Sequence, residues 1–245
     1  MLDVFAIVQG ITELLPISST LHLNLAAGWL NIPWGLSQEI SLHLGTLIAF
    51  GLYFMPRQKW PSFQMCIYLL IATLPAIFVG FYIKKLGYRP PSTWMVYGTI
   101  SGGLGLILAE AIAKKQNTQD INISSSILIG CAQVLAFIPG ASRMGTTVTM
   151  ARMLGVPVQK AIEFSWLLAI PTVGGAIALT SYDAWKGSGA FPIDYYQTAL
   201  TAIIGLFMMH LVKALGNTWL LKICGYYRVA LGLYLMYIGW SYIPI

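Results

Sequence analysis

The sequence predicts an all-α polytopic membrane protein: an inverted-topology repeat of six transmembrane helices plus two re-entrant helix-loop-helix hairpins. Three observations lead to this fold class. Only 9% of the 245 residues are charged and 57% are hydrophobic, whereas about a quarter of the residues of a soluble domain are charged. The chain divides into ten apolar runs, of which four are too short to cross a membrane. These short runs lie at matching positions in the two halves of the chain.

This composition excludes a cytosolic enzyme, a secreted disulfide-stabilised domain and a disordered chain. The net charge of +6 predicts basic loops beside anionic lipid and the cytoplasm, and no nucleic-acid partner is expected. The cysteines lie singly in apolar runs and are expected to be buried and unpaired. No basic segment precedes the first apolar run, so no cleaved signal peptide is expected. A single membrane domain is predicted over 1–245.

The apolar runs are separated mostly by prolines, glycines or charged residues, which commonly mark helix ends. Six long runs are predicted to span the membrane, at 40–55, 63–83, 93–113, 161–181, 195–215 and 226–243. The short runs form two pairs, 4–15 with 20–30 and 123–138 with 144–154, and each pair is interrupted by a polar break that contains proline. Non-helical backbone is tolerated at membrane depth only where it lines a cavity that is buried in protein or filled with water. Each pair is therefore predicted to be a re-entrant hairpin.

The two breaks resemble each other in sequence. Residues 16–19 (Pro-Ile-Ser-Ser) align with 139–142 (Pro-Gly-Ala-Ser) at an offset of 123 residues, and three long runs follow each break. Repeat halves are therefore predicted at approximately 1–122 and 123–245, although chance similarity is the alternative for four matched residues alone. An odd number of spans inverts the second half, and broken helices at matching positions indicate a binding site.

Basic residues predict the orientation of the chain. Under the predicted topology, nine lie on one face and four on the other, with Arg143 inside the membrane. The nine are Arg57, Lys59, Lys114, Lys115, Arg152, Lys160, Lys213, Lys222 and Arg228, and the four are Lys84, Lys85, Arg89 and Lys186. Because cytoplasmic loops are enriched in Lys and Arg, the first face is predicted to be cytoplasmic. Both termini and the mouth of the first hairpin then face outward.

The first hairpin carries polar residues, and ionisable groups at membrane depth usually have a function. Gln9 and Glu13 are four residues apart and share one helix face. Ser19 and His22 are three apart at the start of the next helix, and a hydroxyl beside an imidazole can act as an activated nucleophile or orient a water molecule. The alternative is that Ser18 or Ser19 caps this helix and His22 makes a structural contact.

The second hairpin has the composition of an anion site. Gly140 permits a tight turn, and a helix that begins near Ser142 offers free backbone N–H groups to an anion. Arg143 adds a planar guanidinium that suits phosphate, and Ser142 and Thr147 add hydroxyl donors. A structural ion pair with a glutamate, Glu13 or Glu163, is the alternative for Arg143.

Other polar residues leave two interpretations open. Glu39 and His43 share one helix face, where they either support the site or pair near the membrane interface. Aromatic residues near span ends are expected to form an interfacial belt; they are Tyr226, Tyr227, Trp240 and Tyr242.

Both hairpin sequences resemble signatures of the bacterial undecaprenyl-diphosphatase family, also known as the bacitracin-resistance proteins. The first signature corresponds to residues 9–22, Gln-Gly-Ile-Thr-Glu-Leu-Leu-Pro-Ile-Ser-Ser-Thr-Leu-His. The second corresponds to residues 139–147, Pro-Gly-Ala-Ser-Arg-Met-Gly-Thr-Thr. Segments 42–46 (Leu-His-Leu-Gly-Thr) and 164–171 (Phe-Ser-Trp-Leu-Leu-Ala-Ile-Pro) also match, in the same order along the chain.

The resemblance implies a multi-pass phosphatase of the bacterial plasma (inner) membrane, with its active site opening to the periplasmic face. It implies hydrolysis of undecaprenyl diphosphate to undecaprenyl phosphate and inorganic phosphate, which recycles the lipid carrier for cell-wall synthesis, and a need for Mg²⁺ or Ca²⁺. Carried over by position, the family's acidic pair falls on Gln9 and Glu13, its serine and histidine on Ser19 and His22, and its phosphate-binding residues on Ser142, Arg143 and Thr147. Together with the residues of the two breaks, this predicts Glu13, Ser19, His22 and Arg143 as catalytic residues. The predicted phosphate-binding residues are Ser18, Thr20, Gly140, Ser142, Arg143 and Thr147, and the predicted metal ligands are Glu13 and, as a second candidate, Gln9.

Three positions depart from the family pattern. Gln9 stands where many members have a second carboxylate, which leaves Glu13 as the one hairpin carboxylate able to bind metal or act as a base. Met144 replaces a serine and removes a hydroxyl, and Leu21 replaces a glycine. These departures bear on the number of bound metal ions and on the rate.

The expected chemistry needs positive charge and hydrogen-bond donors around the phosphoryl oxygens. Arg143, a helix N-terminus and a cation held by Glu13 are expected to supply them. Ser19 with His22 as its base is preferred over a directly activated water. The alternative function is a lipid-phosphate transporter or flippase of the same architecture, with or without hydrolysis. The expected partners are the polyprenyl diphosphate and membrane lipids, and a homodimer is left open.

Overall fold

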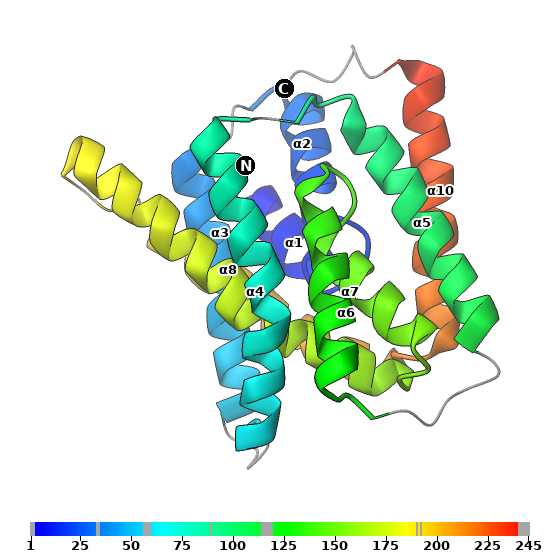
Figure 1. Ribbon diagram of the computed structural model, residues 1–245. Coiled ribbons are helices and arrows are strands. Elements are labelled where there is room, and N and C mark those ends of the chain that lie inside the picture. Colours follow the sequence, from blue (N-terminus) through cyan, green and yellow to red (C-terminus); the bar gives the residue numbers. More distant parts are fainter. Residues whose placement is uncertain are drawn as a thin grey trace.

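The computed structural model describes residues 3–32, 35–55, 60–88, 90–113, 120–189, 191 and 193–239. All regular secondary structure in these residues is helical (Figure 1), which confirms the all-α prediction. The helices are α1 (Asp3–Thr12), α2 (Ser19–Leu30), α3 (Leu36–Phe54), α4 (Phe63–Leu86), α5 (Trp94–Ala113), α6 (Ile123–Gln133), the 3₁₀ helix η2 (Val134–Phe137), α7 (Arg143–Met153), α8 (Val158–Ser188), α9 (Tyr195–Leu215) and α10 (Thr218–Ile238).

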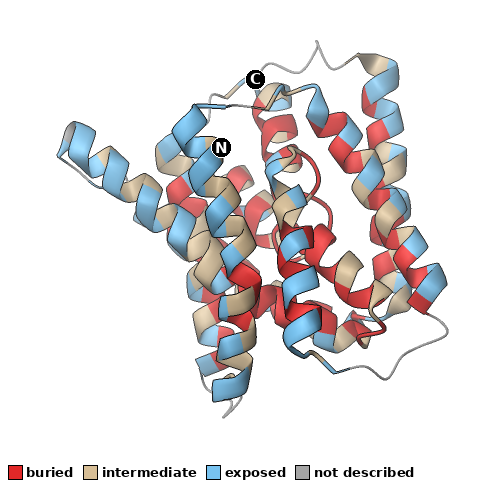
Figure 2. Cartoon of the chain, viewed as in Figure 1, coloured by how far each residue is buried: buried red, intermediate tan, exposed pale blue. Residues whose placement is uncertain are grey.

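Four of the described helices, α4, α5, α8 and α9, are long and apolar enough to cross a membrane. Their outward faces carry large exposed apolar side chains, for example Leu70 and Phe78 on α4. Figure 2 shows this exposed outer surface on α4 and α8, and buried residues around the short central helices. Apolar residues outside and polar residues buried within are the arrangement of a helical membrane protein.

The last predicted run begins too late. Helix α10 starts at Thr218 rather than 226, because the Asn217 side chain accepts hydrogen bonds from two backbone N–H groups of its first turn. Arg228 therefore lies inside a helix, with no exposed surface, so counting it among the basic residues that face the cytoplasm was wrong. The same assignment fails for Arg152, which is 1% exposed and pairs with Glu110 at 2.5 Å.

Removing these two arginines leaves seven of the nine basic residues on the predicted cytoplasmic face. Several residues used in the predictions lie outside the described residues: Arg57, Lys59, Arg89, Lys114, Lys115, Trp240 and Tyr242. The sequence therefore still has more basic residues on the predicted cytoplasmic face, seven, than on the opposite face, four.

The short helices form two pairs that enter the molecule from opposite ends. In Figure 1, α1 begins and α2 ends toward the top, whereas α6 begins and α7 ends toward the bottom. Both second helices are capped by a serine with positive φ: Ser18 (73°) accepts a hydrogen bond from the N–H of Leu21, and Ser142 (69°) from that of Gly145. The structural counterpart of Ser142 is thus Ser18 rather than Ser19, which corrects the offset to 124 residues.

Candidate functional site

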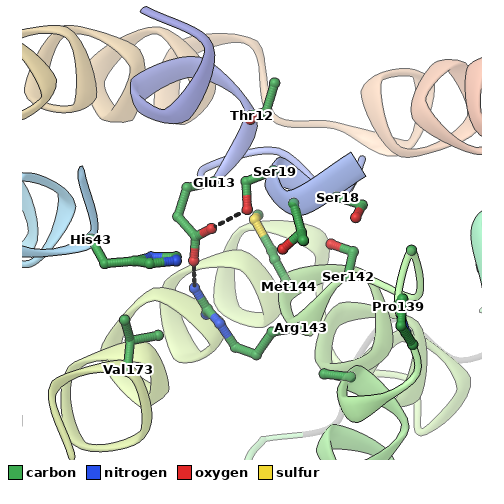
Figure 3. Close-up of a pocket in the computed structure, with 13 residues that line it drawn as sticks. Thr12, Glu13, Ser18, Ser19, His43, Pro139, Ser142, Arg143, Met144 and Val173 are labelled. Atoms are coloured by element: carbon green, nitrogen blue, oxygen red, sulfur yellow. Dashed lines mark hydrogen bonds and ion pairs between the residues drawn. The ribbon is translucent and has the colours of Figure 1, made fainter. Parts of the chain in front are cut away.

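The breaks of the two hairpins border one cavity of about 160 Å³. Figure 3 shows side chains from both halves of the chain converging on it. The lining residues are Thr12, Glu13, Ser18, Ser19, Thr20, His43, Ala136, Pro139, Gly140, Ser142, Arg143, Met144 and Val173. Residues far apart in the sequence therefore meet where the resemblance placed the phosphate chemistry.

Glu13 is the centre of the polar contacts in this cavity. The Ser19 hydroxyl donates to Glu13 Oε2 at 2.6 Å, and Arg143 Nη2 donates to Glu13 Oε1 at 2.9 Å (Figure 3). The two charged side chains are only 9% and 12% exposed, so their attraction is weakly screened by solvent. The ion pair between Glu13 and Arg143, which is the structural alternative for Arg143, thus forms inside the cavity. Its carboxylate also holds the hydroxyl of Ser19, the candidate nucleophile.

Arg143 has a hydrogen-bond donor that remains available to an anion. Its Nη1 donates to the main-chain carbonyl of Ser165 at 2.7 Å, which fixes the guanidinium between α7 and α8. Its Nε is buried and has no hydrogen-bond partner among the described residues. Because a guanidinium has five N–H donors and a buried donor without a partner is costly, an oxyanion beside it would be stabilised.

Two helix N-termini also meet the cavity. Ser18 and Ser19 at the start of α2, and Ser142 and Arg143 at the start of α7, line it. The first turn of a helix has unpaired N–H groups and the positive end of its dipole, and both favour a bound anion. Gly140 makes the second turn possible, since its φ is +83° and an added Cβ would lie 2.0 Å from the Met95 carbonyl oxygen.

His22 lies apart from the Ser19 hydroxyl. Its Nδ1 contacts the Ser18 carbonyl oxygen at 2.7 Å, and its Nε2 contacts the hydroxyl of Tyr227 at 2.7 Å, with the two rings stacked. The predicted contact between Ser19 and His22 is therefore not formed, because the imidazole turns toward α10. Tyr227, which was expected in the interfacial aromatic belt, contacts His22 instead. A catalytic role of His22 stays a prediction.

Other predicted residues are divided between the cavity and its surroundings. Thr20 lines the cavity, but Thr147 does not. The Thr147 hydroxyl donates to the Arg143 main-chain carbonyl at 3.0 Å and shares a hydrogen bond with Ser165 Oγ at 2.7 Å, and only 1% of the residue is exposed. His43 lines the cavity and contacts Gln9 Nε2 at 3.0 Å, so it supports the site. Ser165 was not predicted as a site residue, although a polar residue inside an apolar run is the signal that could have identified it.

Two remaining acidic residues are placed away from the Glu13 carboxylate. Glu163 pairs with Lys213 on α9, and this excludes it as the partner of Arg143. Glu39 lines a second cavity beside the first.

The residues present suit a cation only together with substrate. No group of three or more His, Cys, Asp or Glu residues that could hold a metal occurs in the described parts of the chain. Both Glu13 oxygens are already hydrogen-bonded, whereas Gln9 Oε1 is buried without a partner there. Mg²⁺ usually takes one or two carboxylates plus substrate phosphates and waters, and this donor set fits that pattern.

The second cavity, of about 570 Å³, adjoins the first. The two share His43, Ala136, Arg143 and Val173. Mostly apolar side chains of α3, α4, α8 and η2 line the larger cavity, among them Ile77, Phe81, Phe137 and Leu179. A small polar cavity thus continues into a large apolar one, an arrangement suited to an amphiphilic ligand with an anionic head.

Comparison with known proteins agrees with this chemistry. Residues 3–234 match the family described as Bacitracin resistance protein BacA. A protein of Alteromonas mediterranea named undecaprenyl-diphosphatase is 34% identical over an alignment 259 positions long, which covers 96% of each chain. A protein of the same name from Buchnera aphidicola subsp. Schizaphis graminum is 32% identical, with 92% of each chain covered. The chain therefore belongs to the BacA family of bacitracin resistance proteins.

Proposed function

We propose that this protein is a membrane phosphatase that hydrolyses undecaprenyl diphosphate to undecaprenyl phosphate and inorganic phosphate. The observation that carries the proposal is the Glu13 carboxylate, bonded to both the Ser19 hydroxyl and the Arg143 guanidinium, in a cavity that opens into an apolar one. The relatives named undecaprenyl-diphosphatase, aligned over nearly their whole length, support it. In the cell, this reaction would return the lipid carrier to cell-wall synthesis.

The diphosphate would bind between the two hairpin breaks, with its prenyl chain in the larger cavity. The unpaired Nε–H of Arg143 and the N-termini of α2 and α7 would offset charge on the phosphoryl oxygens. In the dry site these preorganised donors stabilise the transition state more than they would in water.

Ser19 is the nucleophile in this scheme and Glu13 is its base. The Ser19 oxygen forms a bond to the terminal phosphorus, its proton passes to Glu13 Oε2, and the bond to the bridging oxygen breaks so that undecaprenyl phosphate leaves. Glu13 passes this proton on to the departing undecaprenyl phosphate, which restores the carboxylate. Water then attacks the phosphoserine phosphorus, and its proton passes through Glu13 to the Ser19 oxygen as the bond from that oxygen to phosphorus breaks, which yields inorganic phosphate and free Ser19.

A divalent cation would be held by Glu13 and Gln9 together with phosphate oxygens. When bound, it would supply charge stabilisation to the phosphoryl group. We expect chelation by EDTA to abolish turnover and Mg²⁺ or Ca²⁺ to restore it, as phosphate release measures. Gln9→Glu adds a second carboxylate and is expected to lower the cation concentration that gives half-maximal rate. An unchanged metal response in both Gln9→Glu and Gln9→Ala would remove Gln9 from the cation site.

The fold we propose is an inverted repeat with six spans, α3, α4, α5, α8, α9 and α10. Some of the helix contacts support it, because they recur under exchange of the two halves. Helix α1 packs on α9 as α6 packs on α4, and α3 packs on α9 as α8 packs on α4. The pairs α3 with α8 and α5 with α10 lie across the proposed pseudo-twofold axis.

The site is proposed to open to the periplasm, because seven basic residues remain on one face against four on the other. We expect single cysteines at Asp120 and Asn217, on a cysteine-free background, to resist impermeant thiol reagents in intact cells. A cysteine at Tyr88 is the control and is expected to react. Labelling of the first two positions from outside, with Tyr88 protected, would reverse the orientation.

Phosphate release by the purified protein in detergent tests the proposed function. A detergent micelle has no two sides, so a protein that only moves the lipid across a membrane would release nothing. We expect release of one inorganic phosphate for each undecaprenyl diphosphate consumed. Lipid translocation in vesicles without phosphate release in detergent would favour the transporter instead.

A further inference from the structure

One buried arginine outside the cavity contacts both hairpin breaks. Arg228, inside α10, has no exposed surface, and within the described parts of the chain its guanidinium donates only to main-chain carbonyl groups. The acceptors are Thr99 for Nε (3.2 Å), Pro16 for Nη1 (3.0 Å), and Gly98 (3.1 Å), Gly140 (2.9 Å) and Ala141 (2.8 Å) for Nη2.

These acceptors belong to three separate parts of the chain. Pro16 lies in the first break, between Glu13 and Ser19. Gly140 and Ala141 lie in the second break, immediately before the turn that presents Arg143. Thr99 belongs to α5, which packs along α10 and against α7. One planar group thus holds the loops that carry the proposed nucleophile, base and phosphate ligand at a fixed separation.

Glycines on the neighbouring helices leave room for this guanidinium. A Cβ added at Gly102 on α5 would lie 2.0 Å from Arg228 Nη2, and one added at Gly145 on α7 would lie 2.5 Å from Nη1. Real Cβ atoms do not approach so closely, so either side chain would displace the guanidinium. Glycines on both α5 and α7 therefore accommodate the Arg228 guanidinium.

No carboxylate of the described residues forms an ion pair with Arg228. An unpaired charge at this depth is costly, and here carbonyl dipoles alone compensate it. A lysine would keep the charge but offers three donors from one atom, which cannot reach carbonyls spread around a planar group. On these grounds we propose that Arg228 is a positioning residue that fixes the register of the two hairpin breaks, in support of the proposed hydrolysis.

Arg228→Lys and Arg152→Lys provide a matched comparison. Both arginines are buried, but Arg152 binds Glu110 and the Val156 carbonyl at the far end of α7. We expect both variants to unfold at lower temperature than the wild type. At a temperature where both are folded, only Arg228→Lys should lose turnover, by about 100-fold, as expected when catalytic groups are misplaced by about 1 Å. The loss should appear in kcat at saturating substrate.

A second pair keeps the test decisive if Arg228→Lys does not fold. Gly102→Ala pushes on the guanidinium without removing it, whereas a Cβ at Gly105, on the same helix, meets only Thr149 Cγ2 at 3.5 Å. We expect Gly102→Ala to lower kcat and Gly105→Ala to leave it unchanged. Wild-type kcat in folded Arg228→Lys or in Gly102→Ala, or equal losses within either pair, would overturn the inference. An inactive wild-type protein would instead refute the proposed function.

Discussion

Replacing Glu13 with Gln is expected to lower turnover by about 100- to 10,000-fold, the contribution that general base catalysis usually makes. A glutamine amide cannot take the proton of Ser19, and its NH₂ group would face either the Ser19 hydroxyl or the Arg143 guanidinium, where the structure has acceptor oxygens. Phosphate release by folded protein measures the loss. Gln9→Glu is the control one helical turn away, and it is expected to stay active.

Ser19→Ala separates the nucleophile from the base. We expect the single variants Glu13→Gln and Ser19→Ala, and the double variant, to be similarly inactive, because residues that act as one unit are not additive. Ser19→Ala should still bind substrate, since Arg143 and both helix N-termini remain. If the losses of the single variants multiply in the double variant, Ser19 is not activated by Glu13, and a directly activated water is the better nucleophile.

Arg143→Lys is expected to be nearly as damaging, although the charge is kept. Arginine bonds through different nitrogens to Glu13 and to the Ser165 carbonyl while its Nε stays available. One ammonium nitrogen cannot occupy these positions together. Losing such a charge-assisted contact in a buried site costs about 2–5 kcal/mol, or roughly 30- to several-thousand-fold in rate.

Steady-state kinetics on folded Arg143→Lys and Arg143→Ala measure this effect. Met144→Ser, at the neighbouring cavity position, is the control: it supplies the hydroxyl usual in the family and is expected to keep its activity. Near-native turnover in Arg143→Lys would reduce Arg143 to a structural partner of Glu13.

Local sequence patterns predicted most of the fold. Apolar runs bounded by Pro, Gly and charged residues gave helix limits within four residues for most helices. Helix α8 ends at Ser188, seven residues beyond the predicted end of its run, and the last helix begins at Thr218 rather than 226. The late start of the last run has a physical cause: Lys222 and Gly225 interrupt the apolar residues of 218–225 and predict a run boundary there, whereas the helix begins where Asn217 caps it. The proline-containing breaks were also predictable, because broken backbone inside apolar sequence requires a cavity.

The sequence located the two hairpins of the site but not its internal contacts. Glu13, Ser19 and Arg143 stood out because each is polar in an apolar setting. The partner of His22 is Tyr227, 205 residues away, and no local spacing points to it. Arg228 was misplaced for a related reason: charge counting treats every arginine near a run boundary as a loop residue, whereas burial depends on which carbonyls the fold brings around it.

Hydrolysis in water enriched in oxygen-18 most directly tests whether this protein cleaves the terminal phosphate of its lipid. Purified protein in detergent is given undecaprenyl diphosphate and the divalent cation, and both products are analysed by mass spectrometry. Attack at the terminal phosphorus, by Ser19 followed by water or by water alone, predicts one labelled oxygen in inorganic phosphate and none in undecaprenyl phosphate. Label in the lipid product would place the attack at the inner phosphorus, and no phosphate release from folded protein would contradict a phosphatase altogether.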